Sequence, residues 1–320
     1  MPLFDSDIIK YKKISTSRLL PNSLVYDEQI GAQESDRKHI HIIIINQCNL
    51  SCKFCRGGMD KNILNEQTNV KVMGTETFKK IIDKCTDFGV NSFDLTPVIG
   101  ELMLDKNIFD KLDYLENNSL VSNFVVFTNF LNVDREDIIK LSGYTKSTFI
   151  ISVYGLNKET YADNTGKNRF NVFLNNVETL YDVSKENKFK NLYFAIRNNG
   201  NVGESLLYAG FIRMGYEYGY KLMLHEKDNR NRAGHVDVNG KIGSRGGVCP
   251  YGPALGGGID QYGNFLYCPF NDISKKGIVG NIFNSTLAEI YDSQAWKKII
   301  NAHIAGDYSV GICANCNESW

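Results

Sequence analysis

Strand-like and helix-like segments alternate between residues 39 and 225, and this alternation constrains the fold more than any other feature of the chain. Runs rich in β-branched and aromatic residues are followed by stretches whose apolar residues recur at helical spacing. Such alternation is typical of a parallel sheet whose connecting helices pack outside it. The expected strands are 39–46, 92–98, 124–128, 148–153, 192–196 and 221–225. Six strands fall short of the eight that close a full barrel, so we expect an α/β fold with an open, partial (β/α)6 barrel.

The helices of this region are predicted from apolar spacing and from residues that favour helix ends. Asp134 is a suitable N-cap for one helix, and Gly89 is a stop signal for another. Cys85 falls on the apolar face of the first helix, where we expect it to be a core residue. The expected helices are 75–88, 108–115, 134–141, 171–183 and 204–219.

The sequence changes character after His225, and we place a domain boundary there. The residues that follow are rich in Gly, Asn and Arg and show little periodicity. A hairpin is expected over 259–267. An amphipathic helix over 286–303 begins with the capping-box residues Thr286 and Glu289. The predicted organisation is an N-terminal extension (1–38), a partial barrel (39–225), a linker (226–248) and a small C-terminal domain (249–320).

Charge and hydropathy argue against several classes of partner. Lys and Arg total 36, as do Asp and Glu, so the chain lacks the basic excess that nucleic-acid binders show. The strongest apolar run, 42–45, is too short to span a bilayer, and the first 36 residues lack a signal-peptide core. We therefore expect a cytoplasmic protein with no nucleic-acid or membrane partner. Thiols stay reduced in the cytoplasm, so eight cysteines indicate metal binding rather than disulfides.

Three cysteines follow the first expected strand with the spacing Cys-x3-Cys-x2-Cys, namely Cys48, Cys52 and Cys55. Three thiolates can ligate three irons of a 4Fe–4S cube and leave the fourth iron open to a small molecule. Gly57 and Gly58 allow the loop to wrap closely around such a centre. The alternatives are a zinc site, which would need a fourth ligand that is not found nearby, and buried structural thiols. Structural thiols favour apolar periodic positions rather than a polar loop.

This loop, with the aromatic Phe54 before its last cysteine, resembles the signature of the radical S-adenosylmethionine (radical SAM) superfamily. Gly100 and Glu101 resemble the superfamily's Gly-Glu motif, whose backbone and carboxylate hold the methionyl amino group. Leu102 stands where many members have proline. The resemblance implies a cluster that binds S-adenosylmethionine at its open iron and cleaves it reductively. It also implies that the resulting 5′-deoxyadenosyl radical takes a hydrogen atom from the substrate.

The resemblance extends over roughly residues 39–225 and implies further cofactor contacts. Thr128 and Asn129 resemble the Thr-Asn end of the third strand, and Ser152 stands where the superfamily's serine contacts the ribose. Arg197, at the end of the fifth strand, is either a ligand of the methionyl carboxylate or a surface or ion-pair residue. The implied cofactor-binding residues are Phe54, Gly100, Glu101, Thr128, Asn129, Ser152 and Arg197.

Four more cysteines lie in the last quarter of the chain: Cys249, Cys268, Cys313 and Cys316. Four thiolates can fully ligate a second 4Fe–4S cluster or form a zinc ribbon, and the cysteines alone do not decide between them. The two Cys-Pro pairs, the Gly-rich hairpin and the final Cys-x2-Cys resemble the short Twitch form of the SPASM auxiliary-cluster domain. The resemblance implies one auxiliary 4Fe–4S cluster held by these four cysteines.

A fully ligated auxiliary cluster has no site for a substrate, so it would act on electrons. After hydrogen abstraction a substrate radical can lose one electron to such a cluster and one proton to a base. Small cyclitol and amino-sugar dehydrogenases of the Twitch type resemble this layout. We therefore predict a radical SAM oxidoreductase that dehydrogenates a polar small molecule such as a sugar, an aminoglycoside precursor or a cyclitol.

Two other functions stay open. SPASM-type proteins also modify ribosomal peptides by cross-linking, thioether formation or epimerisation, although residues 1–38 are few for a peptide-recognition domain. Epimerisation would need a hydrogen donor, and the spare Cys85 is expected to be buried. A binding module stabilised by zinc at both sites would have no activity. The resemblance also implies a flavodoxin- or ferredoxin-type electron donor.

The proton acceptor cannot be chosen from the sequence. Tyr154 lies two residues after Ser152, where it could face the same cavity or its opposite side. The link segment holds Glu226 and Arg232, which would suit a polar substrate or lie on the surface as solvated charges. The segment 231–234, Asn-Arg-Ala-Gly, resembles a linker motif of other SPASM-type proteins. The candidate catalytic residues are therefore Tyr154, Glu226 and Arg232.

Overall fold

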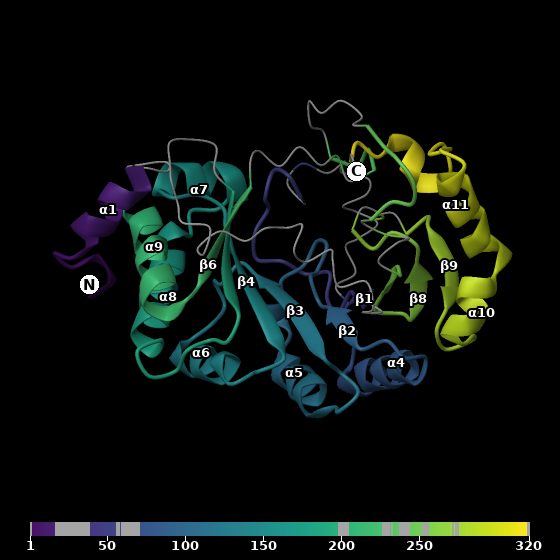
Figure 1. Cartoon of the computed structure of the whole chain (residues 1–320), viewed down its shortest axis with the longest axis horizontal. Coiled ribbons are helices and arrows are strands. Elements are labelled where there is room, and N and C mark those ends of the chain that lie inside the picture. Colours follow the sequence, from purple (N-terminus) through teal and green to yellow (C-terminus); the bar gives the residue numbers. More distant parts are fainter. Residues whose placement is uncertain are drawn as a thin grey trace. The chain divides into compact units, whose positions relative to one another are not determined.

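The structure is a computed structural model (Figure 1). The chain divides into two compact units. The first unit contains the described parts of Met1–Ser35 and Val126–Asp228, and the second those of Asp36–Val125 and Asn229–Trp320. The described residues are 2–16, 39–55, 58, 71–197, 205–225, 231, 233–236, 244–250, 252, 256–270, 272 and 275–318.

The sheet of the second unit joins N-terminal and C-terminal strands in the order β3-β2-β1-β7-β8-β9. Strands β1, β2 and β3 are parallel, and β7 also runs parallel to β1. Strands β8 and β9 continue the sheet in antiparallel pairing. The C-terminal hairpin therefore extends the sheet that carries the first cysteine loop. The bounds are β1 His39–Ile42, β2 Ser92–Asp94, β3 Asn123–Thr128, β7 Gly258–Ile259, β8 Asn264–Leu266 and β9 Ile278–Asn281.

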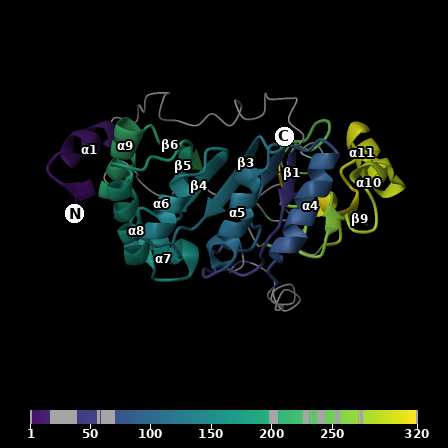
Figure 2. The same ribbon diagram turned by 90° about the horizontal axis from the view of Figure 1, so that it is seen from below.

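Helices α4 (Thr75–Asp87) and α5 (Ile108–Asn117) lie against one face of strands β1–β3 (Figures 1 and 2). The apolar face of α4 is buried, as its spacing predicted. Cys85 lies on this face with no exposed surface, which confirms that it is a core residue. Burial in this apolar face raises the pKa of the Cys85 thiol far above its ordinary value.

The predicted helix over 286–303 is wrong in one respect, because the structure contains two helices there. Helix α10 (Leu287–Asp292) begins with the expected capping box of Thr286 and Glu289. Ser293 then adopts an extended conformation, with ψ of 150°, and caps α11 (Gln294–Ile304) by accepting a hydrogen bond from the backbone of Trp296. The break lets both helices face the aromatic core formed by Phe265, Tyr291 and Trp296.

The first unit contains three parallel strands, in the order β6-β5-β4, with helices beside them. Asp134 caps α6 as predicted, in a reciprocal capping box with Asp137. The segment that follows β4 forms a helix, α7, that the sequence did not predict. The bounds are β4 Ser147–Val153, β5 Leu192–Arg197, β6 Lys221–His225, α6 Arg135–Ser142, α7 Lys158–Thr165, α8 Phe170–Val183 and α9 Leu206–Tyr218.

The N-terminal residues form a second unpredicted helix, α1 (Ile8–Thr16), which packs beside α9 (Figure 2). Arg213 of α9 donates to the carbonyl of Leu3 at 3.1 Å and to the carboxylate of Asp5 at 2.8 Å. These bonds satisfy a buried guanidinium, so the N-terminal segment is part of the first unit.

The expected fold class, an α/β fold with an unclosed parallel sheet, is confirmed. Among the described residues, β6 pairs with β5 alone and β9 with β8 alone, so neither edge strand closes a barrel. No helix in the described ranges is long and apolar enough to cross a membrane. The domain bounds proposed from the sequence stay a prediction.

Candidate active site

The first cysteine loop follows β1 in the second unit. Cys52 is buried, whereas Cys48 and Cys55 are half-buried. The loop is tightly turned, because the backbone of Cys55 donates to the carbonyl of Cys52 at 2.9 Å. A Cβ atom at Gly58 would lie 2.0 Å from the carbonyl oxygen of Lys53, so only glycine fits there. The wrapping of this loop around a metal centre stays a prediction, and Gly57 lies outside the described residues.

The Gly-Glu loop lies directly against this cysteine loop. The thiol of Cys55 lies 3.5 Å from the carbonyl oxygen of Val98, and the backbone of Glu101 donates to the carbonyl of Gln47 at 2.7 Å. A Cβ atom at Gly100 would lie 2.3 Å from the carbonyl oxygen of Ile45, so glycine is required for the two loops to meet.

Glu101 is almost fully buried, with 2% of its surface exposed. One carboxylate oxygen accepts a hydrogen bond of 3.1 Å from the backbone of Met103 and caps the short helix η4 (Leu102–Leu104). A buried carboxylate held in this way beside the cysteines suits recognition of an amino group. The structure thus brings together the cysteines and the Gly-Glu pair that the sequence singled out.

The four C-terminal cysteines are all buried in the second unit. Burial raises the pKa of the Cys313 thiol to about 11, and the neighbouring Cys316 adds to the rise, while Tyr267 and Arg245 oppose it. A Cβ atom at Gly252 would lie 3.1 Å from the Cα atom of Cys268, so the segment after Cys249 packs on Cys268. The raised pKa keeps the Cys313 thiol protonated without a metal, and a bound metal would favour its thiolate, which fits a buried iron–sulfur ligand.

Arg245 holds the loop that carries the last two cysteines, a role that no local pattern in the sequence indicated. Its guanidinium donates to the carbonyl oxygens of Cys313 at 3.1 Å, of Glu318 at 3.3 Å and of Cys316. The same guanidinium lies 5.7 Å from the ring centroid of Tyr308. A planar cation with several donors can bind three carbonyls at once, which fixes the loop η6 (Gly311–Asn315) and places positive charge beside it.

Further hydrogen bonds hold the segments that carry the C-terminal cysteines. The side chains of Asn231 and Asn317 accept hydrogen bonds from each other's backbone, at 2.8 and 3.2 Å, so the linker motif docks on the C-terminal loop. The ring of His303, which is fully buried, accepts a hydrogen bond of 3.3 Å from the backbone of Cys249. Burial lowers the pKa of His303, which favours the neutral ring needed to accept this bond.

Phe54 is buried in the second unit, whereas Thr128, Asn129, Ser152 and Arg197 lie in the first unit, at or next to the carboxyl ends of β3, β4 and β5. Thr128 and Asn129 are buried, and their side chains accept hydrogen bonds from the backbones of Phe130 and Leu131, at 2.9 and 3.1 Å. Ser152 is buried near the end of β4 and lies opposite Ala195 of β5.

Tyr154 and Arg197 lie together at the same edge of the first unit. The guanidinium carbon of Arg197 is 6.0 Å from the ring centroid of Tyr154, within the range of a cation–π contact. The backbone of Tyr154 is fixed, because its carbonyl accepts a hydrogen bond of 2.6 Å from Asn164 of α7. The other two candidates, Glu226 and Arg232, lie outside the described residues.

Comparison with protein families gives two matches. The model described as "Radical SAM superfamily" matches residues 42–201, and the SPASM model, "Iron-sulfur cluster-binding domain", matches residues 249–317. The comparison with curated proteins finds no match.

Similar solved structures share the fold at low identity. BtrN in complex with AdoMet and 2-DOIA has a TM-score of 0.58 at 16% identity, over 88% of this chain and 93% of that one. Streptococcus suis SuiB bound to precursor peptide SuiA has a TM-score of 0.61 at 14% identity, over 83% and 67%. The anSMEcpe enzyme with bound AdoMet has a TM-score of 0.51 at 19% identity, over 83% and 80%.

The superfamily model covers half of the chain, and it includes both the first cysteine loop and the Gly-Glu loop. The SPASM model covers all four C-terminal cysteines. The protein therefore belongs to the radical SAM superfamily, with an iron–sulfur cluster and S-adenosylmethionine as cofactors and a C-terminal SPASM domain for an auxiliary cluster.

Proposed function

We propose that this protein dehydrogenates a polar small molecule such as a sugar, an aminoglycoside precursor or a cyclitol. The observation that carries the proposal is the buried, four-cysteine set of the SPASM domain. Four thiolates leave no open iron for a substrate, so this centre would exchange electrons only. Dehydrogenation needs such a partner, because the substrate loses one hydrogen atom and then one electron and one proton.

The seven cysteines other than Cys85 are the proposed cluster ligands. When bound, the clusters and S-adenosylmethionine supply a 5′-deoxyadenosyl radical for hydrogen abstraction and an acceptor for the remaining electron. Glu101 and the backbone around Gly100 would bind the methionyl amino group, because this buried loop contacts the cysteine loop directly. The proposed ligand sets are Cys48, Cys52 and Cys55 for the first cluster and Cys249, Cys268, Cys313 and Cys316 for the second.

The remaining cofactor contacts are proposed from the superfamily's motif. Ser152 would contact the ribose, and Arg197 the methionyl carboxylate. Thr128, Asn129 and Phe54 would complete the cofactor site. Because the side chains of Thr128 and Asn129 accept backbone hydrogen bonds, they would shape the turn after β3. The proposed electron donor is a flavodoxin- or ferredoxin-type protein.

Similarity to BtrN supports a small-molecule substrate. Its structure contains AdoMet and 2-DOIA, and the alignment covers 93% of that chain. A second candidate, modification of a peptide, is supported by similarity to SuiB, which was solved with the precursor peptide SuiA. The alignment covers a smaller share of SuiB, 67%. We rank the small molecule first for this reason.

The test is product analysis with the reconstituted enzyme under anaerobic conditions. The enzyme, dithionite and S-adenosylmethionine are incubated with a panel of cyclitols, amino sugars and sugars, and with short peptides. We expect a small-molecule product lacking two hydrogen atoms, formed in a one-to-one ratio with 5′-deoxyadenosine. A peptide product without any oxidised small molecule would overturn the first candidate in favour of the second.

A further inference from the structure

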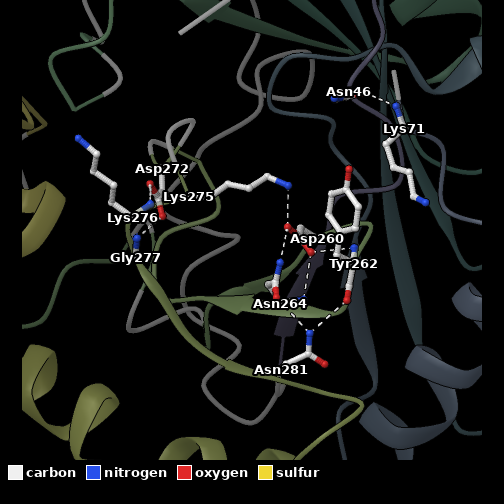
Figure 3. Close-up of polar contacts among 10 residues, drawn as sticks. All are labelled: Asn46, Lys71, Asp260, Tyr262, Asn264, Asp272, Lys275, Lys276, Gly277 and Asn281. Carbon is white, nitrogen blue, oxygen red and sulfur yellow. Dashed lines mark hydrogen bonds and ion pairs between the residues drawn. The ribbon is translucent and has the colours of Figure 1, made fainter. Parts of the chain in front are cut away.

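Two lysine ammonium groups flank one exposed tyrosine ring in the second unit (Figure 3). The Nζ atom of Lys71 lies 5.2 Å from the ring centroid of Tyr262, and the Nζ atom of Lys275 lies 4.7 Å from it. Tyr262 is 49% exposed, so a ligand can reach this group. Lys71 is far from the other two residues in the sequence, and the fold brings it beside them.

The group lies at the edge of the sheet where the first cysteine loop begins. Strand β7 runs parallel to β1, and the backbone of Ile43 donates to the carbonyl of Ile259 at 2.8 Å. Tyr262 therefore follows the carboxyl end of β7, beside the carboxyl end of β1. Ligands of parallel α/β sheets bind at this edge.

Lys71 is tied to the same edge through Asn46, two residues before Cys48. The backbone of Lys71 donates to the side-chain oxygen of Asn46 at 2.7 Å, and the backbone of Asn46 donates to the carbonyl of Lys71 at 3.3 Å (Figure 3). The position of Lys71 is thus coupled to the strand that leads into the cysteine loop.

A fully buried carboxylate, Asp260, holds the other lysine. One of its oxygens accepts hydrogen bonds from the backbones of Tyr262 and Asn264, at 2.8 and 3.0 Å. The other oxygen pairs with the Nζ atom of Lys275 at 2.7 Å. Lys275 has a left-handed backbone, with φ of 57°, which a lysine adopts only when its surroundings impose it. The ammonium of Lys275 is therefore held in place beside the ring.

The group has an excess of positive charge. Asp260 offsets Lys275, whereas Lys71 forms no ion pair with any residue that the structure describes. Lys79 provides a useful contrast on α4. It also lies over a tyrosine ring, that of Tyr114 at 5.8 Å, but Glu76 pairs with it at 3.0 Å.

We infer that Lys71, Lys275 and Tyr262 form an anion-binding site for a phosphate or carboxylate group of the substrate. The inference rests on the proposed function and narrows its substrate class to anionic polar molecules. Lysine ammonium groups bind phosphate as point charges, and the tyrosine hydroxyl can donate a hydrogen bond to either anion.

Equilibrium dialysis of the reconstituted holoenzyme against inorganic phosphate or acetate, at fixed ionic strength, tests the site. We expect Lys71→Met to weaken anion binding about tenfold and Lys71→Arg to retain it, because one positive charge is lost or kept. Lys79→Met should bind phosphate and acetate as tightly as the wild type does. Tighter binding of phosphate would assign a phosphate group to the substrate, and tighter binding of acetate a carboxylate.

Absence of anion binding by the wild type, or equal losses in Lys71→Met and Lys79→Met, would overturn the site. Circular dichroism and iron content establish that each variant is folded. Formation of an oxidised small-molecule product by the wild type and Lys79→Met, measured in the same preparations, separates the two proposals. Oxidised product without anion binding refutes only the site, and anion binding without oxidised product refutes only the proposed function.

Discussion

Phe130 shows how single residues shape the turn after β3 in the first unit. Its backbone is left-handed, with φ of 60°, which costs about 1–3 kcal/mol for a residue with a side chain. The side chain of Asn176 in α8 donates to the carbonyl of Phe130 at 2.8 Å and stabilises this turn. Asn176 is therefore a positioning residue for Thr128 and Asn129.

Replacement of Asn176 by alanine should leave the buried carbonyl of Phe130 without its donor. We expect the free energy of unfolding to fall by about 1–3 kcal/mol and S-adenosylmethionine to bind more weakly. Urea unfolding and calorimetric titration would measure both effects. Asn175→Ala, at an exposed neighbouring position, is the control. Unchanged S-adenosylmethionine binding in a destabilised Asn176→Ala protein would refute the positioning role.

Asp94 is a buried carboxylate on β2 with a shifted pKa. Burial alone would raise its pKa, but His41, His39 and the hydroxyl of Thr96 outweigh burial and lower it to about 2. The closest approach of His41 to this carboxylate is 3.5 Å. A lowered pKa contributes stability that is present above the ordinary carboxyl pKa and is lost as the pH falls toward 2.

Asp94→Asn should remove this contribution of about 2 kcal/mol. We expect the stability difference between wild type and Asp94→Asn to be largest above pH 4 and to shrink between pH 4 and pH 2. Urea unfolding of the metal-free protein, followed by circular dichroism, would show it. Asp292→Asn removes an exposed carboxylate, and its stability difference from the wild type should not vary with pH in this way. A difference independent of pH would contradict the assigned cause.

Among the elements, the short C-terminal 3-10 helix η6 is held in place by side chains from other segments of the chain. Arg245 and Asn231 come from the region between β6 and β7 and bind its carbonyls and the side chain of Asn317. These contacts from distant segments help to keep two cysteines in place.

Arg245→Met should lower the occupancy of the auxiliary cluster, because three carbonyls lose their donor. We expect the iron content to fall by up to half while the first cluster persists. Arg245→Lys should restore little of the auxiliary-cluster occupancy, since the single ammonium of lysine cannot contact three carbonyls as the planar guanidinium does. Iron analysis and electron paramagnetic resonance of the reduced protein provide the readouts, with the exposed Lys298→Met as control. Full iron content in Arg245→Met would contradict this role.

At the scale of the whole molecule, seven cysteines are divided between two proposed metal centres and the eighth is core. Both sets of cysteines belong to the second unit. The proposed function gives each centre a different task, which single substitutions can separate.

Cys52→Ala should abolish cleavage of S-adenosylmethionine, because the first cluster loses a ligand. Cys313→Ala should retain some cleavage but form much less oxidised product, because the electron acceptor is lost. Quantification of 5′-deoxyadenosine and of oxidised product would distinguish the effects of these two substitutions. Cys85→Ala is the matched control and should keep both clusters, since this thiol is buried on α4. Unchanged product formation by Cys313→Ala would exclude the electron-acceptor role.

Local signals in the sequence predicted most of the elements correctly. The capping residues Asp134 and Thr286 begin helices as expected, because a cap is a contact between near neighbours. Helices α1 and α7 were missed, since α1 depends on its packing beside α9 and α7 has little amphipathic pattern. The break at Ser293 was also missed, because apolar spacing continues across it.

The superfamily, the alternation of strands and helices and the two sets of cysteines could be recognised without a structure, because each depends on local spacing and residue type. The distant groups that support these features become visible only in the folded chain. The close approach of Gly100 to Ile45, the three bonds of Arg245 and the pairing of Lys71 with Tyr262 join residues far apart in the chain. Such contacts depend on how the sheet brings its strand ends together, and no local pattern records that arrangement.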